Sequence, residues 1–142
     1  MKLGGWRAYN DYIDVRTGAP LAGNYGLYGI IDQQIWKDGD DKTITVFARV
    51  SGAPERRNVI DTYVDAGIRF AGLVEQRPQD SFGLAFSYAR ISADASAADQ
   101  DAGLPIIRDF EALVELNYQA VVRPGRAVGD AAVIGARTVL NY

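Results

Sequence analysis

Residues 43–51 read TITVFARVS, and this stretch decides the fold that we expect for the chain. Residue types alternate along it with a period of two, as in a β-strand with one apolar and one polar face. The apolar face would carry Ile44, Val46, Ala48 and Val50. The polar face would carry Thr43, Thr45, Arg49 and Ser51, and Phe47 is the exception. Because a guanidinium group is costly to place in hydrocarbon, Arg49 predicts that the polar face contacts water.

Similar runs occur along the whole chain and predict an all-β protein with one domain over residues 1–142. The strand candidates are residues 2–9, 24–36, 43–51, 59–71, 81–92, 110–122 and 131–142. No convincing amphipathic helix longer than two turns is predicted. Short connectors carry turn chemistry, as at residues 38–40 and 77–80, whereas residues 10–23 and 93–109 would form long connectors. Long and short links on alternate sides are typical of an antiparallel up-and-down barrel.

Composition excludes several classes of function. With 0 Cys and 0 His, the chain has no disulfides, no Cys or His metal ligands and no nucleophile paired with histidine. The net charge of −3, with basic residues scattered among acids, argues against nucleic acid as a partner. Carboxylates such as Asp61 and Asp65 would lie about 13 Å apart on one strand, which does not favour a glycosidase pair. We therefore predict no enzymatic activity, no cofactor and no metal site.

Two architectures share the observed alternation. One is a soluble antiparallel sheet, as in a β-sandwich or small ligand-binding barrel, and the other is a transmembrane β-barrel. Aromatic side chains near the strand ends favour the membrane barrel, because such residues form girdles at the two membrane interfaces. The girdle candidates are Tyr25, Tyr28, Trp36, Phe70, Phe82, Tyr118 and Tyr142.

A resemblance to a known family adds to this interpretation. Residues 23–33, GNYGLYGIIDQ, are followed by Phe47-Ala48-Arg49, Arg57-Asn58, Asp65-Ala66-Gly67 and residues 87–92, SYARIS. In their order and approximate spacing, these segments resemble the carbohydrate-selective porin family of Gram-negative outer membranes, called OprB. The resemblance covers nearly the whole chain. It implies about seven strands of a larger, porin-type transmembrane barrel, corresponding to the C-terminal third of the family's barrel.

The resemblance also implies a function and partners. The chain would belong to a passive diffusion channel for carbohydrates such as glucose, in the outer membrane, with a signal peptide expected further upstream. Its partners would be small carbohydrates, the lipid bilayer and the outer-membrane assembly machinery, which reads a terminal aromatic residue such as Tyr142. The lumen-facing candidates are Arg49, Asp61, Tyr63, Asp65, Arg69, Glu115, Gln119 and Arg137. The sequence leaves the sugar and the oligomeric state open, with a soluble small-ligand-binding module as the alternative function.

Overall fold

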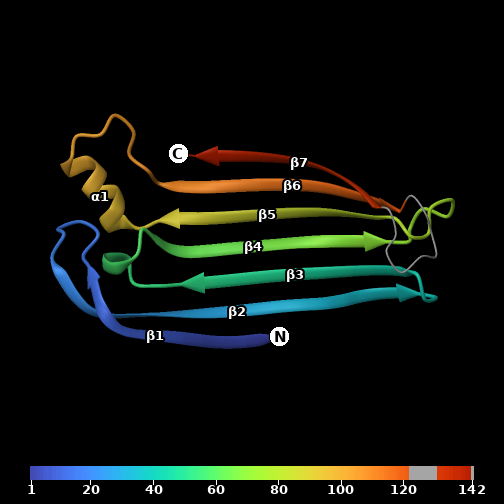
Figure 1. The fold of residues 1–142 in the computed structure, drawn as a ribbon, viewed down its shortest axis with the longest axis horizontal. Coiled ribbons are helices and arrows are strands. Elements are labelled where there is room, and N and C mark those ends of the chain that lie inside the picture. The colour runs from blue at the N-terminus through green and yellow to red at the C-terminus, as the bar shows by residue number, and fades with distance from the viewer. Residues whose placement is uncertain (122–130, 142) are drawn as a thin grey trace.

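The computed structural model describes residues 1–121 and 131–141, which form one antiparallel sheet. Its strands are β1 (Lys2–Ile13), β2 (Pro20–Asp38), β3 (Lys42–Gly52), β4 (Ile60–Ala71), β5 (Ser81–Ile91), β6 (Phe110–Val121) and β7 (Ala131–Asn141). The strand order in space follows the chain, so each strand pairs with the next in an up-and-down meander (Figure 1). Every strand predicted from the sequence is present, and the ends predicted at residues 122 and 142 lie outside the described residues.

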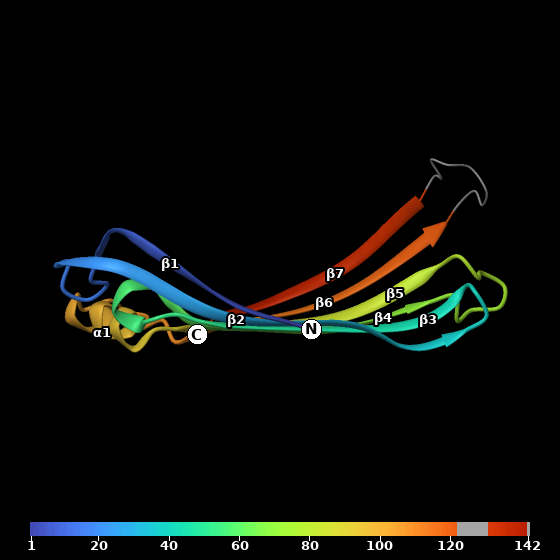
Figure 2. The same cartoon turned by 90° about the horizontal axis from the view of Figure 1, so that it is seen from below.

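The sheet is a single curved layer without an enclosed core (Figure 2). A 3-10 helix, η1 (Glu55–Arg57), and an α-helix, α1 (Ala93–Asp101), lie at one end of the strands and leave the middle of the sheet uncovered. The only apolar side chains buried among the described residues are Ala89, Ile91 and Ala95. Large apolar side chains within the strands are exposed; Leu84, for example, is 48% exposed and Leu116 is 53% exposed. No helix in the described part of the chain is long and apolar enough to cross a membrane.

The pairing register divides the sheet into two faces. Directly opposed residues of an antiparallel pair project from the same face, and the face alternates along each strand. Arg49 is opposite Asp65, and Asp65 is opposite Ser87, so these side chains share what we call the polar face. Val46, Ile68 and Leu84 are likewise in register on the opposite, apolar face. The alternation predicted from residues 43–51 therefore extends across neighbouring strands.

Glycine on the polar face makes room for a large neighbour. Phe47, the exception in the alternation, lies on the polar face opposite Gly67. A Cβ atom added at Gly67 would lie 2.5 Å from a ring carbon of Phe47 and 2.9 Å from the carbonyl oxygen of Leu84. The ring therefore packs directly over the glycine backbone. Since Gly67 has no side chain, the bulky Phe47 fits without pushing β3 and β4 apart.

The first hairpin differs from the sequence-based expectation. Residues 10–23 were predicted as a long connector, but β1 continues to Ile13 through an irregularity between Ala8 and Asp11. The remaining turn is held by Asp14, whose carboxylate accepts hydrogen bonds from the backbone N–H groups of Arg16 and Thr17 at 3.1 and 2.9 Å. Because the Asp14 carboxylate satisfies the backbone N–H groups of the turn, the turn stays short, and β1 and β2 remain paired up to it.

The prediction for residues 93–109 was also incomplete, because this connector contains α1. Ser92 caps the helix, with its hydroxyl oxygen accepting from the N–H of Ala95 at 3.2 Å. Gly103 follows the helix with a positive φ of 64°, and the N–H of Leu104 donates to the carbonyl of Asp99. These are ordinary start and stop signals of a helix. The helix lacks an apolar stripe, and therefore periodicity did not reveal it.

Candidate functional site: the polar face of the sheet

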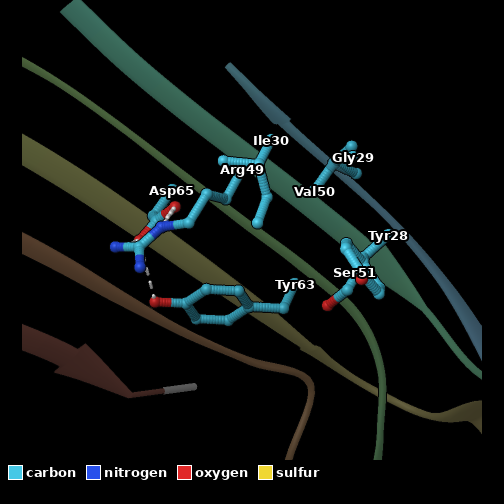
Figure 3. Close-up of a pocket in the computed structure, with 8 residues that line it drawn as sticks. All are labelled: Tyr28, Gly29, Ile30, Arg49, Val50, Ser51, Tyr63 and Asp65. Atoms are coloured by element: carbon cyan, nitrogen blue, oxygen red, sulfur yellow. Dashed lines mark hydrogen bonds and ion pairs between the residues drawn. The ribbon is translucent and has the colours of Figure 1, made fainter. Parts of the chain in front are cut away.

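The centre of the polar face is an ion-paired cluster of Arg49, Asp65 and Tyr63. Arg49 donates two hydrogen bonds to the Asp65 carboxylate, at 2.8 Å from Nε and 2.5 Å from Nη2. The Tyr63 hydroxyl lies 3.5 Å from the same carboxylate (Figure 3). Asp65 is 6% exposed, whereas the Arg49 side chain is 54% exposed. The buried carboxylate thus orients a guanidinium group that remains accessible to solvent.

This cluster borders a shallow pocket of about 200 Å³. Its other lining residues are Tyr28, Gly29, Ile30, Val50 and Ser51 (Figure 3). Guanidinium N–H groups, a carboxylate and hydroxyl groups therefore face one small volume together with aromatic rings. Such a set can exchange hydrogen bonds with a polyhydroxylated molecule without performing chemistry on it.

A second group on the same face surrounds Arg69. Its guanidinium donates to the Ser81 hydroxyl at 3.3 Å. Arg69 lines a pocket of about 420 Å³ together with Asp32, Thr45 and Asn117, among others. Asp32 and Asn117 were not among the predicted site residues. They are found by following the register, since Asp32 is opposite Phe47 and Asn117 is opposite Gly83.

The remaining lumen candidates are more dispersed. Asp61 lies at an irregularity between Ile60 and Thr62 at the start of β4, and its carboxylate accepts hydrogen bonds from the Arg90 guanidinium at 2.8 and 2.6 Å. Asp61 is therefore separate from the Arg49 cluster. Glu115 and Gln119 lie on the polar side of β6. Arg137 is opposite Glu115 in the backbone register, and its side chain lies outside what the structure describes.

Four of the girdle candidates form one row across the sheet, at the strand ends far from α1. Trp36 is opposite Ile44, Ile44 is opposite Phe70, Phe70 is opposite Phe82, and Phe82 is opposite Tyr118. The rings of Phe70 and Phe82 are stacked, with centroids 4.5 Å apart. We call Trp36, Phe70, Phe82 and Tyr118 the aromatic row, and it lies on the apolar face.

The other three girdle candidates lie elsewhere. Tyr25 is on the apolar face near the opposite end of the strands, opposite Arg7. Tyr28 is opposite Ser51, which places it on the polar face, where it borders the pocket of Arg49. The sequence-based expectation did not separate these two tyrosines because both precede the centre of the expected strand. Tyr142 lies outside the described residues.

Ion pairs hold the connectors at both ends of the strands. The Thr17 N–H and the Arg56 guanidinium lower the pKa of Asp14 to about 2. Arg108 lowers the pKa of Asp99, and Arg16 lowers that of Asp101. At the far end, Arg77 and then the Tyr118 hydroxyl lower the pKa of Asp80. No cluster of three or more carboxylates suited to a metal ion occurs in residues 1–121 and 131–141.

The sheet is a single meander with one uncovered apolar face, an aromatic row near one end of its strands and an ion-paired polar face on the other side, and this combination defines a class of protein. It has the construction of the wall of a membrane β-barrel channel. The chain belongs to the carbohydrate-selective porin family OprB, whose family model matches residues 1–142. OprB is a family of outer-membrane channels rather than of enzymes.

A solved structure shows the same fold. The chain is similar to OprB of Pseudomonas putida in its high-pH structure, with a TM-score of 0.74 and 18% sequence identity. The match covers 99% of this chain and 44% of that porin, so the chain spans less than half the length of its structural relative. No match was found among curated protein sequences. The predicted fold class, a porin-type antiparallel β-barrel wall, is confirmed by the family and structural matches.

Proposed function

We propose that this chain forms part of the wall of an outer-membrane diffusion channel for carbohydrates, with its polar face toward the water-filled path. The observation that supports this most is the pair of opposite, uncovered faces in a chain of the OprB family. The apolar face would contact lipid, because exposing side chains such as Leu84 and Leu116 to water is unfavourable.

Within this channel, the Arg49 cluster is the proposed contact site for sugar. Arg49 presents planar N–H donors to vicinal hydroxyl groups, and Asp65 supplies acceptors while holding Arg49 in place. Tyr63 and Tyr28 border the same pocket and offer ring faces against which a sugar ring can pack. We therefore assign Tyr28 to the water path instead of the girdle.

The other lumen candidates are given distinct roles in this proposal. Arg69, together with Asp32 and Asn117, lines a second polar pocket, which is proposed as a further contact site along the path. Glu115, Gln119 and Arg137 extend the polar wall across β6 and β7. Asp61 is assigned to holding the strand end through Arg90. Insertion by the outer-membrane assembly machinery, a glucose-like substrate and export by an upstream signal peptide belong to the same proposal.

The alternative of a soluble ligand-binding module has less support. A sandwich or small closed barrel would cover the apolar face with a second layer or with the rest of its own sheet. In the described part of the chain neither arrangement occurs, and β1 and β7 are the two edge strands of an open sheet. We therefore retain the channel as the single proposed function.

Liposome swelling tests the proposal directly. The purified chain is inserted into liposomes, and swelling in isotonic glucose is compared with that of protein-free liposomes and with swelling in the larger sugar stachyose. We expect glucose to enter faster than in the protein-free control and faster than stachyose. Because β1 and β7 are open edges, a path requires copies of the chain to pair edge to edge, and a glucose rate equal to the protein-free rate would show that the inserted copies do not form one.

A further inference from the structure

A pocket at the α1 end of the sheet carries two arginines, Arg7 and Arg57, that form no ion pair with an acidic side chain of the described residues. The pocket has a volume of about 400 Å³ and lies where β1, β2 and η1 meet. Its lining residues are Arg7, Ala22, Gly23, Asn24, Tyr25 and Arg57. We call it the arginine pocket.

Arg7 and Arg57 differ from most arginines of the described chain. Six others pair with aspartates, and these are Arg16, Arg49, Arg56, Arg77, Arg90 and Arg108. Arg57 instead donates to the carbonyls of Gly23 and Ala22, at 2.8 and 3.5 Å. Arg7 lies over the Tyr9 ring, 5.1 Å from its centroid. Both guanidinium groups keep further N–H donors and an unbalanced charge, which together suit a phosphate group.

The pocket also lies at a defined height on the apolar face. Arg7 is opposite Tyr25, on the same face as Leu27 and Val64. Tyr25 is about ten residue positions from the aromatic row when the register is followed through β3. That corresponds to about 33 Å along the strands and, at a tilt near 40°, to roughly 25 Å across the bilayer. The apolar band of outer-membrane barrels has about this height, so Arg7 would lie at the second interface.

We propose that the arginine pocket binds the phosphate of a membrane-lipid headgroup. A charge on a lipid-facing strand costs little at the interface, and there it meets the lipid phosphates. Tyr25, 58% exposed, stands beside Arg7 as an interfacial aromatic residue does. The inference rests on the proposed membrane insertion but not on the sugar path.

Native mass spectrometry in neutral detergent tests this inference, with phosphatidic acid as the probe and diacylglycerol of the same acyl chains as the phosphate-free control. The informative variant is Arg7→Gln, because the Arg7 side chain makes a cation–π contact with Tyr9 and no hydrogen bond to another side chain of the described residues. The matched control is Lys2→Gln, which removes one positive charge from the same strand on the polar face. Circular dichroism establishes that each variant retains its strands.

We expect the chain to bind phosphatidic acid in preference to diacylglycerol. Arg7→Gln should weaken this binding about tenfold, because a charge-assisted hydrogen bond to the phosphate is lost. Lys2→Gln should leave it unchanged. Equal effects of the two variants, equal binding of the two lipids, or binding of inorganic phosphate as tightly as phosphatidic acid would overturn the assignment to a lipid headgroup. Glucose-driven swelling is measured separately, so failure of lipid binding is distinguishable from failure of the sugar path.

Discussion

At the scale of single residues, the best defined feature is the Arg49–Asp65 pair. The two residues are directly opposite on neighbouring strands, and two hydrogen bonds fix their relative orientation. Removal of one partner from a buried ion pair is strongly destabilising, because the other group loses its compensating interaction. Under the proposed function, the pair couples the electrostatics of the water path to the geometry of the proposed sugar-contact site.

Replacing Arg49 by Gln should change both sugar affinity and ion selectivity. We expect half-saturation for glucose to rise about tenfold, because a charge-assisted hydrogen bond worth roughly 1.5–3 kcal/mol is lost. The uncompensated Asp65 carboxylate should also shift the reversal potential in a salt gradient toward cation selectivity. Planar-bilayer recordings with and without glucose measure both effects.

The matched control is Arg16→Gln, which removes a guanidinium group that pairs with Asp101 in the strand-end connectors. It should leave the reversal potential and the glucose response unchanged. An Arg49→Gln channel with unaltered glucose half-saturation and unaltered selectivity would show that Arg49 is only a solvated wall charge.

Asp14 makes the first hairpin sensitive to acid. Its folded-state pKa of about 2 lies below the ordinary aspartate value of 3.8, so the carboxylate stabilises the turn at neutral pH. This stabilisation is complete above about pH 4 and is lost as the pH falls toward 2. The protection of the Arg16 and Thr17 amides, measured as their exchange rate relative to the intrinsic rate at each pH, should decrease over that window. Arg56→Gln should move the transition to higher pH, and protection that stays constant from pH 5 to pH 2 would contradict this account of the turn.

At the scale of strands, the β3–β4 pair depends on the fit of Phe47 over Gly67. Gly67→Val should lower the free energy of unfolding by about 1–3 kcal/mol, since the new side chain would overlap the Phe47 ring and the Leu84 carbonyl. Urea titrations in detergent micelles measure this loss. In a Phe47→Ala background the same substitution should cost less, because most of the overlap is gone. An equal cost in both backgrounds would exclude the ring as the cause.

The helix α1 depends on its cap. Ser92 is fully buried, and its hydroxyl accepts from the N–H of Ala95. Ser92→Ala should destabilise α1 by about 1 kcal/mol and increase amide exchange at Ala95 and the next residues. The control is Ser87→Ala on the polar face of β5, which should leave exchange in α1 unchanged. If Ser92→Ala has no more effect than the control, the cap does not hold the helix.

The strands were predictable from sequence to a greater degree than their connectors. Alternation identified each strand of the part of the chain that the structure describes, because one face of each is largely apolar. The extension of β1 and β2 was missed, since Asp14 holds a turn that composition suggested was a long loop. Helix α1 was missed because it lies at the strand ends and needs no continuous apolar stripe.

The residue types of the candidate site were predictable from the sequence, but the contacts between residues on neighbouring strands were not. Alternation placed Arg49, Tyr63 and Asp65 on polar faces, whereas only the register brings Arg49 opposite Asp65. Tyr28 was assigned to a girdle because β2 was expected to be shorter than its observed 19 residues. Asp32 and Asn117 were overlooked because each needs a neighbouring strand in register before its place becomes clear.

At the scale of the whole molecule, the polar face and the apolar face of the sheet require different surroundings, one aqueous and the other apolar. The polar face carries ion pairs and pockets, while the apolar face carries exposed aliphatic and aromatic side chains. A bilayer on one side and a water-filled path on the other satisfy both faces at once. The edge strands β1 and β7 remain to be paired within such a wall.

A spin-label scan of β5 in liposomes is the most direct test of this central claim. The chain has 0 Cys, so single cysteines at residues 82–87 can be labelled without background. Labels at Phe82, Leu84 and Phe86 should be relaxed by lipid-soluble oxygen, and labels at Gly83, Ala85 and Ser87 by a water-soluble nickel chelate. Such a two-residue alternation is the predicted result. Equal access of the nickel chelate to both sets, or a reversed pattern, would contradict the assignment of the apolar face to lipid and the polar face to water.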